Sequence, residues 1–250
     1  MDKGDLYLLL FFSEMITAVV VFILLMFFTA PYGKHSRKGW GPMMGSRSAW
    51  VLMELPAVFV IVIVLVVFGK GVDFVNLTFL FLWELHYLYR TFLFPVFMRG
   101  SRRSFPVILV IFALLFNCLN GTLNGIFLGF GRDMEWMYSI PFIVGTSVFF
   151  SGFALHVMSD SIIRSLRKRG ESRYRIPVKG PFRLVSNPNY LGEIIQWWGW
   201  ALLTFSLAGV AFAVFTTANL LPRAISNHEW YRNHFRDYPE GRRILIPYIF

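Results

Sequence analysis

Long apolar runs separated by short polar loops extend along most of this sequence. Each run is close to the roughly 20 residues that an α-helix needs to cross the hydrocarbon core of a bilayer. The pattern predicts an all-α integral membrane protein, a bundle of seven transmembrane helices. The predicted spans are residues 6–30, 49–68, 75–98, 105–130 and 140–163, a sixth that starts near 190, and a seventh that ends near 223. A tight turn is predicted at 207–209, although the last two spans could instead form one long kinked helix.

The charged residues lie mainly in the loops, and they alternate along the chain. The loops after the first, third and fifth spans and the C-terminal tail are basic, whereas the N-terminal segment and the other loops are nearly neutral. Because cytoplasmic loops collect Lys and Arg, we expect the N-terminus outside and the C-terminus in the cytoplasm. Membrane topology and contact with membrane lipids explain the net charge of +10, so we expect no nucleic-acid partner. No loop can hold a soluble domain, and residues 1–250 are predicted to form a single polytopic membrane domain.

Residue types and spacing exclude several kinds of site. Cys118 is the single cysteine, which rules out an intrachain disulfide and a cysteine metal cluster. The five histidines form no HExxH or HxxxH pattern, so we expect no metal. The sequence has neither a GxGxxG motif after a strand nor a GxxxxGKS/T motif. A nucleotide would therefore have to bind at the cytoplasmic mouth of the helix bundle.

A strongly basic stretch at 160–196 joins the fifth span to the sixth. Its many arginines suit a polyphosphate, because each guanidinium presents a planar fork of donors to phosphate oxygens. The polar side chains of Asn187, Asn189, Tyr190 and Glu193 then continue into an otherwise apolar segment. Such groups are costly in a membrane unless a partner or ligand satisfies them. The alternative is a loop that only sets topology and contacts anionic lipid, but it leaves the Asn and Glu residues unexplained.

Acidic side chains also occur within the predicted spans. Glu54 lies well inside the second span and is a candidate for a ligand pocket, although bonding to a neighbouring helix is the alternative. Glu14, in the first span, is interpreted as structural. In the third span Glu84, Tyr87 and Arg90 are three residues apart and share one helix face. That face either lines a ligand cavity, with Tyr87 as a donor to a carbonyl, or forms a polar seam along the helix.

Two further groups of polar side chains lie within the fourth and fifth spans. Asn117, Asn120 and Asn124 recur at intervals of three and four residues, which favours hydrogen bonds between helices over ligand contact. His156 and Asp160 lie four residues apart at the inner end of the fifth span and lead into the basic stretch. Both groups are therefore placed on the interior of the bundle.

Several motifs resemble those of the membrane steroid 5α-reductases, the 3-oxo-5α-steroid 4-dehydrogenases. They are PYGKH at 31–35, ELP at 54–56, HYLYRTF at 86–92, SD at 159–160, YRIP at 174–177, NYLGEIIQW at 189–197, RA at 223–224 and the terminal DYP and LIPYIF. The similarity covers nearly the whole chain. Its C-terminal half alone also resembles sterol Δ14-reductases, enoyl-CoA reductases and isoprenylcysteine methyltransferases. The combination of Glu54 and Tyr87 narrows the resemblance to the 5α-reductases.

The resemblance implies a seven-helix bundle that binds NADPH from the cytoplasmic side. A lipophilic steroid would enter from the bilayer into a pocket formed mainly by the first four helices, where Glu54 and Tyr87 would contact its 3-keto oxygen. The cofactor pocket would come mainly from the last three helices and the cytoplasmic loops. The implied cofactor-binding residues are Arg90, Arg102, Arg103, Asp160, Arg167, Tyr174, Arg175, Asn189, Glu193, Arg223, Asn227 and Tyr231.

The implied reaction is reduction of the Δ4 double bond of a 3-ketosteroid. Hydride would pass from NADPH to C5 while Tyr87 and Glu54 polarise the 3-keto oxygen. The protein would reside in the endoplasmic reticulum of a eukaryote or in the inner membrane of a bacterium. The alternatives are another membrane reductase acting on a sterol diene or an acyl-CoA, a methyltransferase that binds S-adenosylmethionine, and a non-enzymatic membrane protein.

Overall fold

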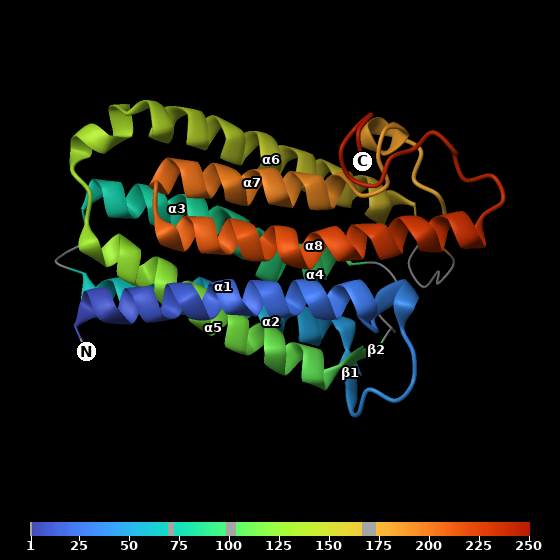
Figure 1. Cartoon of the computed structure of the whole chain (residues 1–250), viewed down its shortest axis with the longest axis horizontal. Helices are drawn as coiled ribbons and strands as arrows, with labels where there is room; N and C mark the ends of the chain where they lie inside the picture. The colour runs from blue at the N-terminus through green and yellow to red at the C-terminus, as the bar shows by residue number, and fades with distance from the viewer. Residues whose placement is uncertain (1, 70–72, 99–103, 167–173) are drawn as a thin grey trace.

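The structure is a computed structural model that describes residues 2–69, 73–98, 104–166 and 174–250, and helices dominate it (Figure 1). The α-helices are α1 (Lys3–Phe27), α2 (Ser46–Phe68), α3 (Phe74–Leu88), α4 (Phe94–Phe97), α5 (Val107–Phe130), α6 (Ile140–Ser165), α7 (Pro188–Thr204) and α8 (Leu207–His234). A π-helical segment, η2 (Tyr89–Leu93), joins α3 to α4. The short 3-10 helices are η1 (Gly33–His35), η3 (Met134–Tyr138) and η4 (Gly180–Arg183).

Five of the described helices, namely α1, α2, α5, α6 and α8, are long and apolar enough to cross a membrane. This finding identifies a multi-pass membrane protein. α3, η2 and α4 follow one another without a break, so the predicted third span is also helical, whereas α7 is shorter, at 17 residues. The N- and C-termini lie at opposite ends of the long axis, as an odd number of crossings requires (Figure 1). The count of seven spans and the orientation of the termini stay predictions.

The prediction for the last two spans needs correction at two points. The chain turns at Phe205 and Ser206, not at 207–209, because Phe205 adopts a left-handed conformation with φ of 46°. The Ser206 side chain then caps α8 by accepting a hydrogen bond from the Gly209 N–H at 2.9 Å. α8 also continues to His234 instead of ending near Arg223. Its polar last part remains helical because one side of it is covered by the first loop and the C-terminal tail.

A small β-sheet was not predicted. β1 (Met43–Gly45) pairs with β2 (Ser104–Pro106) in antiparallel register, with Met44 opposite Phe105. The pair joins the segment before α2 to the segment before α5. It therefore fixes the start of two helices that also pack along their length through Gly121 and Gly125, where α2 approaches the α5 backbone closely.

Glycines fix the contact between α6 and α7. Gly145 and Gly152 on α6 face Gly192 and Gly199 on α7, and a Cβ at any of these positions would meet the backbone of the opposite helix. The two helices therefore approach each other closely along their whole contact. This seam sets the position of the inner end of α6 relative to the first turns of α7, where several predicted site residues lie.

We expect Gly192→Ala to impair stability and activity together. The added methyl group would meet the backbone of His156, so α6 and α7 must separate. Overpacking of this kind costs about 1–3 kcal/mol. Thermal unfolding in detergent, measured beside the activity of the protein, tests the expectation. Gly45→Ala is the matched control, because nothing lies within 4 Å of its added Cβ. An unchanged melting temperature for Gly192→Ala would contradict the close packing.

Buried asparagines connect the helices, as predicted. The Asn117 side chain of α5 donates to the Met53 carbonyl of α2 at 2.6 Å. The Asn124 carbonyl oxygen accepts from the Trp200 indole of α7 at 2.9 Å. Trp200 belongs to an aromatic core with Trp83 and Trp197, all of them fully buried. Indole, amide and backbone groups thus satisfy one another's hydrogen-bonding capacity in the buried interior.

The C-terminal tail is fastened to the segment before α7 and to the last part of α8. The buried Ser186 hydroxyl lies 2.6 Å from both His228 Nδ1 and the Tyr238 hydroxyl, and it donates to the Arg243 carbonyl at 3.0 Å. A backbone bond from Arg243 to Leu184 at 3.0 Å extends this contact. The tail therefore holds the loop before α7 in place beside α8.

Candidate active site

Arg90 is the centre of a cluster of charged side chains between four helical segments. Its guanidinium lies 3.9 Å from the Glu54 carboxylate of α2, 3.8 Å from Asp160 of α6 and 3.9 Å from Glu193 of α7. All four side chains are largely buried. Three carboxyl groups around one guanidinium give the cluster an excess of acid, and low dielectric strengthens every charge interaction within it.

Local backbone geometry positions Arg90. The residue lies in the π-helical segment η2, and such segments occur often at functional sites. The wider turn directs its guanidinium between Trp50 and Phe94, at 4.5 Å and 4.9 Å from their ring centres. The alternative of a polar seam with Glu84 is wrong, because Arg90 pairs with carboxyl groups of α2, α6 and α7. The Glu84 carboxyl oxygens have no hydrogen-bond partner among the described residues.

His156 joins the same cluster, although it was not among the predicted site residues. Its Nε2 lies 3.6 Å from the Asp160 carboxylate and its Nδ1 lies 3.6 Å from Glu193. Nδ1 is also 3.2 Å from the Asn189 carbonyl, and the Asn189 amide donates to Asp160 at 3.2 Å. The i, i+4 spacing of His156 and Asp160 on α6 was the sequence signal for this arrangement.

Tyr87 lies beside the charged cluster, in the aromatic core. Its ring centre is 4.8 Å from that of Trp83 and 5.7 Å from that of Trp197. The side chain is buried and lies within electrostatic range of Glu54 and Glu193. No hydrogen bond of the Tyr87 hydroxyl to a described residue is present. The hydroxyl is therefore available to a ligand in a region that excludes water.

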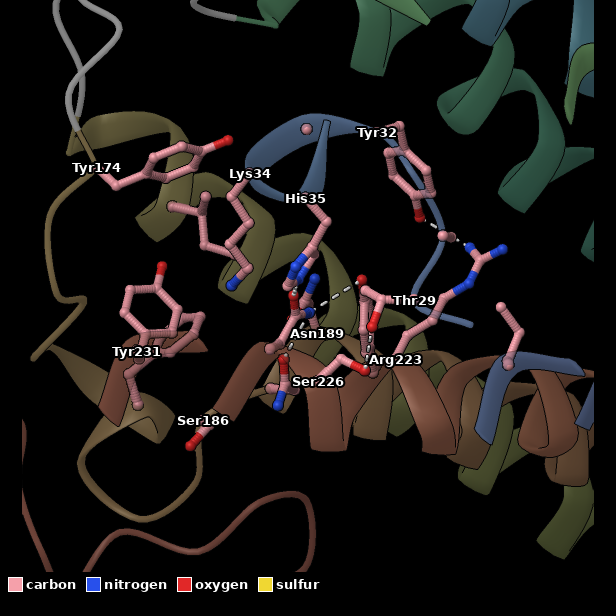
Figure 2. Close-up of a pocket in the computed structure, with 18 residues that line it drawn as sticks. Thr29, Tyr32, Lys34, His35, Tyr174, Ser186, Asn189, Arg223, Ser226 and Tyr231 are labelled. Carbon is pink, nitrogen blue, oxygen red and sulfur yellow. Dashed lines mark hydrogen bonds between the residues drawn. The ribbon is translucent and has the colours of Figure 1, made fainter. Parts of the chain in front are cut away.

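A cavity of about 270 Å³ opens at the end of the bundle where α1 ends and α7 begins (Figure 2). Figure 2 shows side chains of the loop after α1 facing side chains of α8 across it. Its polar lining comprises Thr29, Tyr32, Lys34, His35, Tyr174, Ser186, Asn187, Asn189, Tyr190, Arg223, Ser226, Asn227 and Tyr231. No Asp or Glu lies among the described residues that line it. Asn189 connects the cavity to the Arg90 cluster, because it lines the cavity and also donates to Asp160.

A hydrogen-bonded network shapes one wall of this cavity. The Asn227 amide donates to the Asn187 side chain at 3.1 Å and to the Tyr190 hydroxyl at 3.3 Å. Its carbonyl oxygen then faces His35 Nε2 at 3.2 Å, so we assign the proton to that nitrogen. Burial lowers the pKa of His35, which favours this neutral form near pH 7. The first loop is thereby fixed to α7 and α8.

Two cations and several aromatic rings face the same space. Arg223 donates to the Tyr32 hydroxyl at 2.8 Å, while its buried Nε has no hydrogen-bond partner among the described residues. Lys34 Nζ lies 4.0 Å from the ring centre of Tyr231 and 5.1 Å from that of Trp230. Positive charge in a lining that has no Asp or Glu among its described residues, together with aromatic rings, suits an anionic ligand that contains aromatic bases.

The structure thus places most of the predicted residues in two connected groups. Glu54, Arg90, Asp160, Asn189 and Glu193 form the cluster, and Tyr174, Asn189, Arg223, Asn227 and Tyr231 line the cavity. Arg175 is exposed and does not line the cavity. Arg102, Arg103 and Arg167 lie outside the described residues.

Sequence reasoning missed the contribution of the first loop. Tyr32, Lys34 and His35 line the cavity, yet their basic loop was interpreted as a sign of topology and family resemblance, and none of the three was predicted as a site residue. The PYGKH motif could have identified them. It places a tyrosine, a lysine and a histidine in a stretch of four residues just after the predicted first span.

Comparison with known proteins identifies the family of this chain. A sequence model described as 3-oxo-5-alpha-steroid 4-dehydrogenase matches residues 103–250. A steroid 5-alpha-reductase of Solanum lycopersicum is 37% identical over 256 residues, covering 98% of both chains. The 3-oxo-5-alpha-steroid 4-dehydrogenase 1 of Mus musculus is 37% identical over the full length of both. The corresponding human enzyme 2 is 40% identical over 88% of this chain and 87% of its own. The chain therefore belongs to the 3-oxo-5-alpha-steroid 4-dehydrogenase family of oxidoreductases.

Proposed function

We propose that this protein uses NADPH to reduce the Δ4 double bond of 3-ketosteroids, giving 5α-dihydrosteroids. The observation that carries the proposal is the position of Arg90, whose guanidinium joins Glu54 to Asp160 and Glu193. Glu54 lies beside Tyr87, and Asp160 is bonded to Asn189 at the cavity. A buried path of polar side chains thus connects Tyr87 and Glu54 to the cavity. The positive charge of that cavity suits a nucleotide.

The cavity residues fit the cofactor. Arg223, with its unpartnered Nε, and Lys34 supply positive charge for phosphate oxygens, and the additional 2′-phosphate of NADPH favours such a surplus of cations. Tyr174 and Tyr231 offer ring faces for an adenine. Asn189, Asp160 and Glu193 lie toward the bundle interior and would hold the nicotinamide end. When bound, NADPH supplies the hydride.

Tyr87 and Glu54 perform the polarisation of the steroid. Both donate hydrogen bonds to the 3-keto oxygen, on which negative charge develops when C5 is reduced. The core formed by Trp83 and Trp197 excludes water from this oxygen, which strengthens both bonds. Glu54 holds a proton for this role, because Asp160 and Glu193 already exceed the single positive charge of Arg90, and a third carboxylate there would be unfavourable.

The direct experiment is NADPH oxidation by the purified protein in detergent, with testosterone or progesterone added. We expect oxidation only with steroid present, and slower oxidation when NADH replaces NADPH. Identification of the product by mass and retention must show the 5α-dihydrosteroid. Binding of NADPH without reduction of either steroid would contradict the proposed substrate. An absence of NADPH binding would contradict the proposed cavity.

Glu54→Gln is expected to lower kcat/KM by about 10–10²-fold while NADPH binding is retained. The amide has the same shape, but it is a weaker hydrogen-bond donor than a carboxylic acid. Steady-state kinetics with testosterone, together with cofactor titration, measure both effects. Glu135→Gln, at an exposed position in η3, is the matched control. Wild-type kinetics for Glu54→Gln would remove the acid from the mechanism.

The remaining expectations about placement belong to the same proposal. Residues 1–250 form one membrane domain of seven spans, with the nucleotide cavity on the cytoplasmic side. The steroid enters from the lipid. The membrane is the endoplasmic reticulum if the source is eukaryotic and the inner membrane if it is bacterial. Proteolysis of sealed vesicles, which cuts exposed loops on one side only, tests this orientation.

A further inference from the structure

Residues 245–250 form an apolar hook that has its own backbone hydrogen bonds. The Leu245 and Ile246 N–H groups donate to the Phe250 carbonyl at 2.8 Å and 2.6 Å, and the Phe250 N–H donates to the Ile246 carbonyl at 3.0 Å. Tyr248 adopts a left-handed conformation with φ of 66°, which is unfavourable for a bulky side chain. The hook is thus held in one tight turn, although the proposed mechanism uses none of its residues.

The hook directs its apolar side chains outward. Tyr248 is 79% exposed and Ile249 is 78% exposed, and Ile246 and Phe250 are exposed as well. Leu184, in the segment that pairs with the tail, is 41% exposed. Apolar side chains in water forgo the stabilisation that burial gives. A strained turn that exposes such side chains indicates that a partner covers them.

Hydrogen bonds place the start of the hook beside α7 and α8. The Arg243 carbonyl accepts from the Ser186 N–H at 2.8 Å. The Asn187 side chain donates to the Ile244 carbonyl at 3.2 Å and to the Ala224 carbonyl of α8 at 3.0 Å. The first residue before α7, the residue before the hook and Ala224 therefore lie at one level of the bundle.

That level is the predicted boundary of the membrane. Ala224 follows Arg223, near which the predicted last span ends. A Cβ at Gly180 of η4 would lie 3.2 Å from Ile162 of α6, one residue before the predicted end of the fifth span. α8 continues to His234, about 16 Å beyond Arg223, and the tail then returns toward α6 and α7 (Figure 1). The hook therefore lies at the level of the lipid headgroups.

Positive charge surrounds the hook. Residues 174–186 and 241–250 contain no Asp or Glu. Lys179, Arg183 and Arg243 are exposed in these two segments. Apolar and aromatic side chains flanked by Lys and Arg are typical of segments that lie in the interface of a bilayer, where the cations attract anionic lipid. A second copy of this chain would bring the same positive charge to the surface, so anionic lipid is the better partner.

We propose that the hook is an interfacial anchor that inserts into the headgroup region of a bilayer containing anionic lipid. Tyr248 and Ile249 enter the lipid, and the exposed cations of the two segments, such as Arg183 and Arg243, contact lipid phosphates. The membrane surface thus covers the apolar side chains that the strained turn exposes.

Insertion of the hook also supports one wall of the cavity. The Ser186 hydroxyl donates to the Arg243 carbonyl, and the Asn187 amide donates to the Ile244 carbonyl. Ser186 and Asn187 line the cavity, while the two carbonyls directly precede the hook. The bilayer therefore holds these acceptors in place and positions the wall through them.

Spin labels measure the depth of the hook directly. Cys118→Ser gives a protein without cysteine, into which Ile249→Cys introduces the nitroxide label. The labelled protein is placed in nanodiscs of phosphatidylcholine and phosphatidylglycerol. We expect oxygen, which concentrates in lipid, to relax the label at 249 more strongly than a water-soluble nickel complex. Glu240→Cys, exposed in the same tail, is the matched control and should show the opposite order.

The same measurement can overturn the proposal. Stronger relaxation by nickel at position 249 would place the hook in water, and protection from both reagents would show that protein, such as a second copy, covers it. Arg183→Gln should shift the hook toward water by about fivefold, the factor that one cation contributes near an anionic surface. Arg236→Gln, at an exposed position after α8, is its control. The same depth in pure phosphatidylcholine would contradict the role of anionic lipid.

Cofactor binding tests the link between the hook and the cavity wall, and this part rests on the proposed function. Replacing Tyr248 and Ile249 together with Ser should raise the Kd of NADPH in nanodiscs by about threefold or more, with kcat at saturating NADPH unchanged. Tyr248→Trp with Ile249→Leu keeps apolar side chains and should restore the wild-type Kd. An unchanged Kd in the Ser variant would overturn the link. If the wild type binds no NADPH, the proposed function fails, whereas the depth of the label still tests the anchor.

Discussion

Tyr87→Phe should lower kcat by about 10²-fold or more without weakening the binding of NADPH. The ring stays in place between Trp83 and Trp197, because the substitution removes one oxygen and no ring contact. The lost group is a neutral donor aimed at the position where charge develops on the 3-keto oxygen. A donor in a site without water is worth a few kcal/mol, which corresponds to this loss of rate.

Single-turnover reduction of testosterone and fluorescence titration of NADPH separate the two effects. Tyr89→Phe is the matched control, because it removes a hydroxyl two residues away that accepts from Arg164 at 3.1 Å. We expect the control to stay close to wild type. Equal rates for Tyr87→Phe and wild type would exclude Tyr87 as a proton or hydrogen-bond donor.

Arg90→Ala should abolish steroid reduction and weaken cofactor binding at the same time. It leaves Glu54, Asp160 and Glu193 near one another without a compensating cation. Removing one partner of a buried ion pair costs about 3–5 kcal/mol, so we expect kcat/KM to fall by about 10³-fold or more. Arg90→Lys keeps the charge but not the planar fork, and its loss should be smaller.

The effect of Arg90 must be separated from a general loss of charge. Arg47→Ala removes an exposed guanidinium that donates to the Met98 carbonyl at 2.9 Å, outside the cluster, and should leave turnover unchanged. Thermal unfolding with and without NADPH shows whether the variant is folded. Retained NADPH stabilisation in Arg90→Ala would contradict a role for the cluster in holding the cofactor.

The helices could be predicted closely because each apolar run is bounded by charge. α1, α2, α5 and α6 begin and end within about three residues of the predicted spans. The end of α8 could not be predicted, because hydropathy falls at Arg223 while the helix continues. What holds its last turns is contact with distant segments, such as the bond between Asn227 and His35. The hydropathy pattern of one segment cannot reveal its contacts with distant segments.

The site could be predicted in its residues but not in its connections. Motifs identified Glu54, Arg90 and Glu193, which lie far apart in the sequence. That Arg90 contacts the other two depends on the packing of α2 and α7 against the π-helical segment. The sequence likewise could not show that Glu14 has no hydrogen-bond partner among the described residues. Its polar neighbours Ser13 and Thr17 bond to the backbone of their own helix.

The central claim is that this chain transfers hydride from NADPH to C5 of a 3-ketosteroid. It is tested most directly with NADPH dideuterated at nicotinamide C4 and testosterone as substrate, followed by mass spectrometry and NMR of the product. The account predicts 5α-dihydrotestosterone with a single deuterium at C5 and none at C4. Deuterium at another carbon, or a reduced product without deuterium, would contradict it.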